Sequence, residues 1–297
     1  MSRSPPRFPG DEFSLRRVKG VLFFINSCTD ATRALPPYDP VLSPPGTAIE
    51  EATRGGVHYL EVLGRLHKSL EPRMYLEIGV RHGHSLELAR GPAIGVDPAP
   101  DIQVTPLKPT TRVVAMSSDD FFEAMSGHAL PLAPDLVFID GMHLFEYALR
   151  DFMNIEQLAT PGTVVVIDDV YPSHPAQAER NRRTRVWTGD IWKLPRCLAE
   201  VRPDLFLLPL DTAPTGLLLV VGLDSANRVL WDRYSPIVRQ YTAAMAPPLE
   251  VLSRRDAMAP KDQRVAKVLA VLRQSRGATR VEILPKLRAA LATGAFV

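Results

Sequence analysis

The chain has 297 residues, which is enough for one large domain or for one domain with appendages. Its hydrophobic content of 45% and charged content of 23% are typical of a globular protein, and the formal net charge of +2 provides no general field that would attract nucleic acid. The longest N-terminal apolar run, VLFFI (21–25), is too short for a signal-peptide core or a membrane span. The two cysteines, Cys28 and Cys197, suggest neither a metal site nor a disulfide framework, so we expect a cytoplasmic protein with no nucleic-acid or membrane partner.

The N-terminal part, residues 1–46, is rich in proline and predicts an irregular arm in which VLFFINS (21–27) docks on the main body. A helical pattern follows over 47–70, and Gly55 and Gly56 are candidates to interrupt it early. The apolar stripe of this helix consists of Tyr59, Leu60, Val62, Leu63, Leu66 and Leu70.

Seven apolar runs of strand length come next. Near-continuous apolar runs that alternate with helix-like stretches indicate a parallel sheet covered on both faces. Five of the runs fit this pattern: MYLEIGV (74–80), AIGVD (93–97), RVVAM (112–116), DLVFID (135–140) and TVVVID (163–168). The last two, LFLLPL (205–210) and GLLLVVGL (216–223), are joined by a turn so short that they must be antiparallel. We therefore predict a seven-stranded α/β sheet.

Helices are expected beyond the sheet at 226–245, 261–275 and 281–292, so the predicted domains are the arm 1–46, a cofactor-binding domain 47–225 and a helical extension 226–297. Basic residues surround the apolar face of the middle helix. Two interpretations remain for it: packing on the body or on a second subunit, and binding of an anionic partner. The oligomeric state stays open, with a homo-oligomer among the alternatives.

A glycine-rich turn follows the first sheet strand in MYLEIGVRHGHSLELA, with Glu77, Gly79, Gly83 and Ser85. A nucleotide-like cofactor needs a bare backbone here, and a following helix N-terminus would offer free N–H groups. Many α/β proteins need glycine at this point for packing alone. The spacing also departs from the dinucleotide motif, because Arg81 occupies its second glycine position.

Two acidic segments follow the next strands. Asp97 ends the second strand in GVDPAP, where a carboxylate accepts hydrogen bonds from ribose hydroxyls. Ser118 and Asp119 follow the third strand in MSSDDFF. They are candidates to flank an adenine ring, and a helix N-cap with acidic first-turn residues explains them equally well.

Three carboxylates end the fourth and fifth strands: Asp140, Asp168 and Asp169. Neighbouring tips of a parallel sheet share one edge, where the carboxylates would repel one another unless a hard cation such as Mg²⁺ binds them. The alternative is that each aspartate caps a following turn. His143 lies three residues after Asp140 and would suit a general base next to a metal-bound hydroxyl, or it is an exposed residue at a helix start.

Two further groups have competing interpretations. His82 and His84 form an H-x-H pair, for which loop residues flanking the cofactor are the better explanation than a metal site. Trp187, Asp190 and Trp192 in RVWTGDIWK either line a substrate pocket or belong to the core.

These motifs together resemble the class I S-adenosylmethionine-dependent methyltransferases over residues 72–223. The sequence is most similar to the metal-dependent bacterial sugar and macrolide O-methyltransferases and, more distantly, to catechol O-methyltransferase. The resemblance depends on four segments: E-x-G-x-x-x-G-x-S at 77–85, GVDP at 95–98, FIDGMHLFEYALRDF at 138–152 and IDD at 167–169.

The resemblance implies a Rossmann-like methyltransferase fold, with five parallel strands plus an antiparallel hairpin. It also implies a role for each matched residue. The methyl donor S-adenosylmethionine would contact Glu77, Gly79, Gly83, Ser85, Asp97, Ser118 and Asp119; Mg²⁺ would be bound by Asp140, Asp168 and Asp169; and His143 would be the catalytic base. Some similar sequences carry His-Asp in place of Asp168-Asp169, which leaves the metal requirement open.

The expected function is methylation of a hydroxyl on a small molecule, such as a sugar or a natural-product ring. Two other classes remain as alternatives: a nicotinamide-dependent oxidoreductase on a similar fold, and a non-catalytic cofactor-binding or assembly protein.

Overall fold

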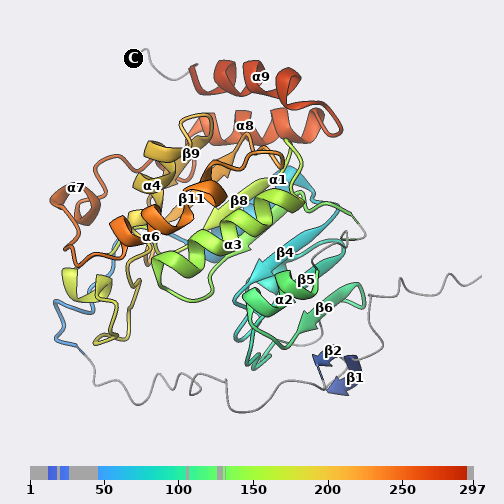
Figure 1. The fold of residues 1–297 in the computed structure, drawn as a ribbon, viewed down its shortest axis with the longest axis horizontal. Coiled ribbons are helices and arrows are strands. Elements are labelled where there is room, and N and C mark those ends of the chain that lie inside the picture. The colour runs from blue at the N-terminus through green and yellow to red at the C-terminus, as the bar shows by residue number, and fades with distance from the viewer. Residues whose placement is uncertain are drawn as a thin grey trace, which may run out of the picture.

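The computed structural model describes residues 13–18, 21–26, 46–104, 107–125, 130 and 132–292, with the backbone alone for the first two ranges. Nine strands form one sheet in the order β1-β2-β6-β5-β4-β7-β8-β11-β9 (Figure 1). Their bounds are β1 Phe13–Val18, β2 Val21–Asn26, β4 Tyr75–Ile78, β5 Ala93–Val96, β6 Thr111–Val114, β7 Leu136–Ile139, β8 Val164–Ile167, β9 Phe206–Leu210 and β11 Leu217–Val221. A separate parallel pair joins β3 (Val57–His58) to β10 (Thr212–Ala213).

The central part of the sheet has the predicted architecture. Strands β6, β5, β4, β7 and β8 are parallel neighbours, and β11 is antiparallel to both β8 and β9. All seven predicted strands exist within a few residues of their expected bounds, so the Rossmann-like fold with a terminal antiparallel hairpin is confirmed. The strand order changes direction between β4 and β7, because β5 and β6 are added on one side of β4 and β7 and β8 on the other. Open α/β sheets bind ligands at such a point, at the carboxyl ends of the strands.

Helices cover both faces of this sheet. On one face lie α2 (Ser118–Ala124), α3 (Phe145–Leu158), α4 (Lys193–Val201), α5 (Val229–Asp232) and α6 (Tyr234–Tyr241), and on the other lie α1 (Tyr59–Leu70), α8 (Gln263–Gln274) and α9 (Arg280–Ala292). The short α7 (Leu249–Leu252) and the 3-10 turns η1 (Leu86–Leu88) and η2 (Pro175–Ala178) connect them.

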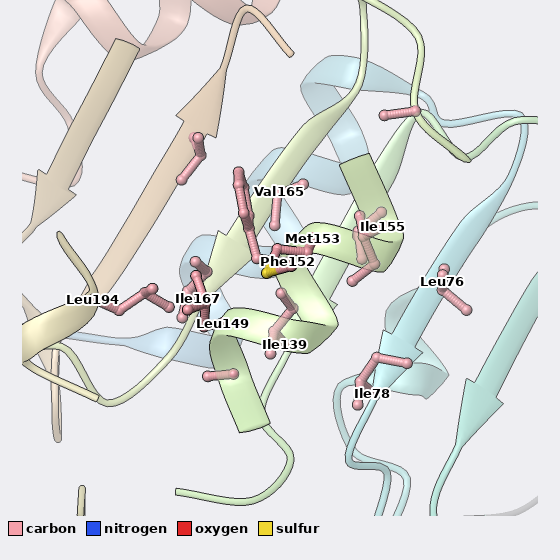
Figure 2. Close-up of a cluster of buried hydrophobic side chains, with 14 of the residues drawn as sticks. Leu76, Ile78, Ile139, Leu149, Phe152, Met153, Ile155, Val165, Ile167 and Leu194 are labelled. Atoms are coloured by element: carbon pink, nitrogen blue, oxygen red, sulfur yellow. The ribbon is translucent and has the colours of Figure 1, made fainter. Parts of the chain in front are cut away.

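The strands are buried on both faces, as their uninterrupted apolar runs predict. In β4, Leu76 and Ile78 belong to the cluster under α3, whereas Tyr75 belongs to the cluster under α1. Figure 2 shows the first cluster, in which Leu149, Phe152 and Met153 of α3 meet Val165 and Ile167 of β8. Successive side chains along each strand therefore point alternately to the face covered by α3 and to the face covered by α1.

Several elements differ from the prediction. The helix expected from Ser85 onward is the single turn η1, because Gly91 and Pro92 end the segment within a few residues. The predicted helix 47–70 begins only at Tyr59, after the break expected at Gly55 and Gly56. The predicted helix 226–245 is divided into α5 and α6, since Pro236 cannot continue a helix from Asp232.

The N-terminal run Val21–Ile25 lies within β2, which pairs in parallel with β6 through Phe23–Val113 and Phe24–Val114. This run is thus docked on the main body, between β6 and β1, as expected, whereas most of the proline-rich arm lies outside the described residues. Cys197 is a buried free thiol, and Cys28 falls outside the described part of the chain. Within the described residues, no helix has the length and apolar content needed to cross a bilayer.

Candidate active site

The polar residues predicted to form a site lie at the carboxyl ends of β4, β7 and β8. Backbone hydrogen bonds connect these ends: the Asp140 N–H donates to the Ile78 carbonyl at 2.8 Å, and the Asp168 N–H donates to the Ile139 carbonyl at 3.0 Å. The parallel ladder therefore continues past the strands and brings Asp140 and Asp168 onto adjacent positions of one edge.

Among the described residues, one group has the geometry of a metal site: Asp140, His143 and Asp169, whose candidate ligand atoms all lie within 4.8 Å of one another. The His143 Nε2 atom is 3.5 Å from Asp140 Oδ1, and the His143 Nδ1 atom is 2.9 Å from Asp169 Oδ2. Asp169 has a φ of 66°, in the left-handed region that aspartate adopts more readily than most residues. Its carboxylate thereby turns back toward His143.

Asp168 is adjacent to this group without belonging to it. Its Oδ1 accepts hydrogen bonds from the Asp169 N–H at 2.8 Å and from the Thr215 hydroxyl at 3.2 Å. Thr215 comes from the loop before β11, so this contact joins the antiparallel hairpin to the edge of the parallel sheet.

The imidazole of His143 is held in one orientation. Its Nδ1 lies 2.6 Å from the Trp187 carbonyl, and the two rings stack with centroids 5.1 Å apart and planes inclined by 14°. Both neighbours of Nδ1, a carbonyl and the Asp169 carboxylate, are hydrogen-bond acceptors, so Nδ1 must carry a hydrogen. The nitrogen that can take up or release a proton is therefore Nε2, which faces Asp140.

A glycine makes this contact with the loop feasible. Gly189 has a φ of 52°, and a Cβ atom on it would lie 1.6 Å from the His143 carbonyl oxygen. Asp190 follows, is buried, and accepts from the Phe145 N–H at the start of α3. Of the residues considered for a substrate pocket, Trp187 thus contacts the site, whereas Trp192 is buried in the core.

The close acidic groups change one another's protonation. Burial and the charge of Asp169 raise the pKa of Asp140, and burial with the charges of Asp169 and Asp140 raises the pKa of Asp168 well above its usual range. Burial opposes the charged form of His143, but Asp169 and Asp140 outweigh it and raise the pKa of the imidazole well above its ordinary value. Three carboxyl groups thus lie close to one imidazole, and a bound cation would relieve the repulsion among them.

The glycine turn after β4 lies against the same edge. Gly79 has a φ of 86°, and a Cβ atom on it would lie 1.9 Å from the Asp140 carbonyl oxygen, so only glycine lets the two strand tips touch. Gly83, with a φ of 84°, packs near Val104.

Glu77 and Ser85 are buried rather than open to solvent. The Glu77 carboxylate accepts from the Tyr75 hydroxyl at 2.7 Å and from the Ser85 hydroxyl at 2.5 Å. Burial raises the pKa of Glu77 to about 8, although both hydrogen bonds act to lower it. The hydrogen bond between Ser85 and Glu77 thus stabilises the turn from its buried side.

Asp97 and the α2 start have partners of their own. The Asp97 carboxylate accepts from the backbone N–H groups of Val80 and Arg81 at Oδ2 and of Ala99 at Oδ1, at 2.8–2.9 Å, and Oδ1 keeps a further lone pair for a ligand. The helix N-cap is Ser117, while Asp119 forms a two-bond ion pair with Arg150. His82 and His84 are loop residues outside the acidic group.

One residue of the site has no signal in the sequence. Tyr59, the first residue of α1, was expected only as part of an apolar stripe, yet burial and the charges of Asp140, Asp168, Glu77 and Asp169 together raise the pKa of its hydroxyl. Its position depends on how α1 packs on the sheet, which periodicity alone does not reveal.

Comparison with known proteins supports one part of this picture. Residues 76–170, about a third of the chain, match the model of a family described as a methyltransferase domain. This segment contains both motif-bearing turns and all three aspartates, and it confirms the resemblance to methyltransferases that the motifs indicate. None of the curated proteins compared matches the chain.

Solved structures match at low similarity. An O-methyltransferase from Bacillus cereus, in complex with S-adenosylhomocysteine (SAH), is 17% identical, with a TM-score of 0.42 over 56% of this chain and 80% of its own. The O-methyltransferase TomG from Streptomyces achromogenes, involved in tomaymycin synthesis and in complex with S-adenosylmethionine (SAM), is 18% identical, with a TM-score of 0.41 over 55% of this chain and 78% of its own.

Proposed function

We propose, starting from the methyltransferase domain of residues 76–170, that the protein transfers a methyl group from S-adenosylmethionine to a hydroxyl oxygen of a small molecule, with Mg²⁺ as a cofactor. We further propose a sugar or a natural-product ring as the acceptor. The observation that supports this most strongly is the convergence of Asp140, His143 and Asp169 at the edge where Gly79 touches Asp140. A donor pocket and a site for proton removal would then be neighbours.

The residues present fit a divalent cation. Asp140 and Asp169 provide carboxylate oxygens that converge, and Asp168 would complete the set through its second oxygen, since Oδ1 is already bonded. Oxygen ligands of this kind are those that Mg²⁺ prefers. When bound there, the cation would supply positive charge that lowers the pKa of a nearby acceptor hydroxyl.

His143 would act as the general base, because a cation bound by Asp140 and Asp169 would offset the two charges that otherwise raise the pKa of its imidazole. The Trp187 carbonyl and Asp169 hold the Nδ1 hydrogen, so Nε2 receives the proton of the acceptor hydroxyl. The oxygen bonds to the methyl carbon as the carbon–sulfur bond breaks, and a neutral thioether leaves. The donor supplies the activated methyl group, and the task of the protein is alignment and proton removal.

The donor would lie across the ends of β4 and β5. Gly79 and Gly83 keep the turn free of side chains, and Asp97 would offer its remaining Oδ1 lone pair to a ribose hydroxyl. Ser118 and Asp119 begin α2 next to this edge, where we propose that they contact the adenine. Glu77 and Ser85 would act on the donor through the turn that they stabilise.

The experiment measures methyl transfer from labelled S-adenosylmethionine to a panel of sugar and phenolic hydroxyl acceptors, with Mg²⁺ and with EDTA. We expect turnover that EDTA abolishes and that His143→Ala lowers about 10²–10⁴-fold, the usual contribution of a general base. His174→Ala serves as the matched control, since His174 caps η2 and lies outside the cluster. Unchanged turnover in His143→Ala would refute its assignment as base.

The same preparation separates this proposal from its alternatives. Calorimetry should detect binding of S-adenosylhomocysteine and none of NAD. Binding of NAD alone would favour an oxidoreductase, and donor binding without a metal site or acceptor-dependent turnover would favour a non-catalytic role.

A further inference from the structure

Asp190 holds the start of the helix that follows His143. Its Oδ1 atom accepts a hydrogen bond at 2.8 Å from the N–H of Phe145, the first residue of α3. The N-cap residue of this helix is Leu144, whose side chain cannot accept a hydrogen bond. Asp190 therefore supplies the cap from a distant segment of the chain, and its carboxylate lies at the positive end of the helix dipole.

The loop that carries Asp190 contacts His143 at two further points. The Trp187 carbonyl and ring hold the imidazole, and Gly189 lies so close to the His143 carbonyl oxygen that no side chain fits between them. His143 precedes Phe145 by two residues, so a shift of the Phe145 N–H moves the backbone that carries the imidazole. The loop thus fixes both the ring of His143 and its place at the start of α3.

Two cations hold the other oxygen of Asp190. Its Oδ2 atom accepts from Arg180 Nη1 at 2.8 Å and from Lys193 Nζ at 3.2 Å. Lys193 is as deeply buried as Asp190, and it also donates to two carbonyl groups at and just after the end of α6. An asparagine that kept the bond to α3 would turn its amide N–H groups toward both cations. The contact with the helix therefore requires a carboxylate.

Asp190 has no access to a substrate, since it is 1% exposed and both of its oxygens are bonded to the protein. We propose that Asp190 is a positioning residue for methyl transfer, which fixes the start of α3 and thereby aligns His143 Nε2 with the acceptor hydroxyl. This inference rests on the proposed function, in which His143 is the base. A displacement of about 1 Å at a reacting group costs about 10²-fold in rate.

The test compares Asp190→Asn with Asp135→Asn, the same substitution at a second buried carboxylate. Asp135 pairs with Arg73 at the amino end of β7, the end away from the site. Methyl transfer is measured with Mg²⁺ at a temperature where circular dichroism shows every variant to be folded. We expect Asp190→Asn to lower kcat about 10- to 100-fold and to leave the acceptor KM and the Kd of S-adenosylhomocysteine unchanged. Asp135→Asn should have the kcat of the wild type.

Double variants show whether Asp190 acts through His143. In the His143→Ala background no imidazole is left to position, so Asp190→Asn should lower the residual turnover less than about twofold. If Asp190→Asn lowers turnover by the same factor in both backgrounds, or leaves kcat unchanged when His143 is present, the inference is wrong and the proposed function stands. If the wild type shows no turnover with any acceptor, the proposed function fails and the inference fails with it.

Arg180→Gln decides the same question if Asp190→Asn does not fold. The Arg180 side chain is 34% exposed, so its replacement is milder, and it loses one of the two cations on Asp190 Oδ2. Its control is Arg73→Gln, at the partner of Asp135. We expect Arg180→Gln to lower kcat about threefold or more when His143 is present and to have no effect in the His143→Ala background. An equal loss in both backgrounds would overturn the inference.

Discussion

Gly79 shows how a single missing side chain brings the two halves of the site together. Its backbone is in the left-handed region, and the Asp140 carbonyl occupies the place where a Cβ atom would be. Gly277 shares the positive φ, at 81°, but has nothing within 4 Å of its would-be Cβ. Substitution at the two positions therefore distinguishes the cost of backbone strain from the cost of a steric clash.

We predict that Gly79→Ala lowers the free energy of unfolding by roughly 3–5 kcal/mol, because it adds a backbone clash to the strain of a positive φ. Gly277→Ala should cost only about 1–2 kcal/mol, the strain alone. Chemical denaturation of both variants measures the difference. Equal losses would show that the contact between the strand tips is not tight.

Asp151 is a buried carboxyl outside the predicted site. It lies on α3, is 2% exposed, has one oxygen without a hydrogen-bond partner and accepts a bond from Ser118. Burial raises its pKa to about 7, against about 3.9 for an unfolded aspartate. The folded protein thus binds more protons than the unfolded chain between these two values.

From this sign we predict that the contribution of Asp151 to stability is largest below pH 4 and is lost as the pH rises toward about 7. Asp151→Asn, which keeps an acceptor for Ser118, should remove that part of the pH dependence and should stabilise the protein at pH 8. Denaturation curves from pH 5 to pH 8 measure both effects. An identical pH dependence in the variant would contradict the assignment.

At the scale of elements, Arg254 connects the segment after α7 with the loop that carries Thr215. Its side chain is 4% exposed, pairs with Asp211 at 2.8 Å and donates to the carbonyls of Thr212, Pro214 and Tyr171. Four acceptors, one after β8 and three in or next to β10, thus depend on one guanidinium. The neighbouring Arg255 is 64% exposed and forms only long ion pairs.

We predict that Arg254→Gln destabilises the protein by roughly 2–4 kcal/mol, because several buried carbonyls lose their donor. It should also weaken Mg²⁺ binding, since Thr215 would no longer be held against Asp168. Arg255→Gln should change stability by less than about 0.5 kcal/mol. Metal titration of both variants, together with denaturation, provides the comparison. Unaltered metal affinity in Arg254→Gln would show that the loop that carries Thr215 does not affect the metal site.

The seven central strands were predictable because each is an apolar run long enough to be buried on both faces. The short pair β3–β10 was not, since two residues carry no periodicity and the pairing joins segments more than 150 positions apart. The positions of Asp140, His143 and Asp169 could be predicted because these residues follow the ends of two predicted strands. The positions of Tyr59 and the Trp187 carbonyl could not, because they depend on tertiary packing. The missing helix after Ser85 had a local cause, since Gly91 and Pro92 end the segment within a few residues.

For the molecule as a whole, the C-terminal helices complete the core. Val268 and Leu272 of α8 and Ile283 of α9 are fully buried, in the same cluster as Phe138 and Val166 of the sheet. Figure 1 shows α9 lying over α8 at one end of the sheet. The expectation that the middle helix packs on the body is therefore met by its apolar face, while two of its basic residues pair with Asp262 and Glu71.

We predict that Ile283→Ala destabilises the whole protein by about 2–5 kcal/mol, the usual cost of truncating a fully buried large side chain. Val281→Ala, on the same helix but 82% exposed, should change stability by less than about 0.5 kcal/mol. Thermal unfolding followed by both fluorescence and circular dichroism measures the losses. A separate early transition in Ile283→Ala would mean that α9 melts independently of the sheet.

The pairing of β3 with β10 has a consequence for synthesis on the ribosome. A nascent chain that ends before Thr212 already contains both glycines of the β4 turn and the four groups at the tips of β7 and β8, but β3, which leads into α1, has no partner strand yet. The β3–β10 pair can therefore form only after the chain has been synthesised beyond Ala213.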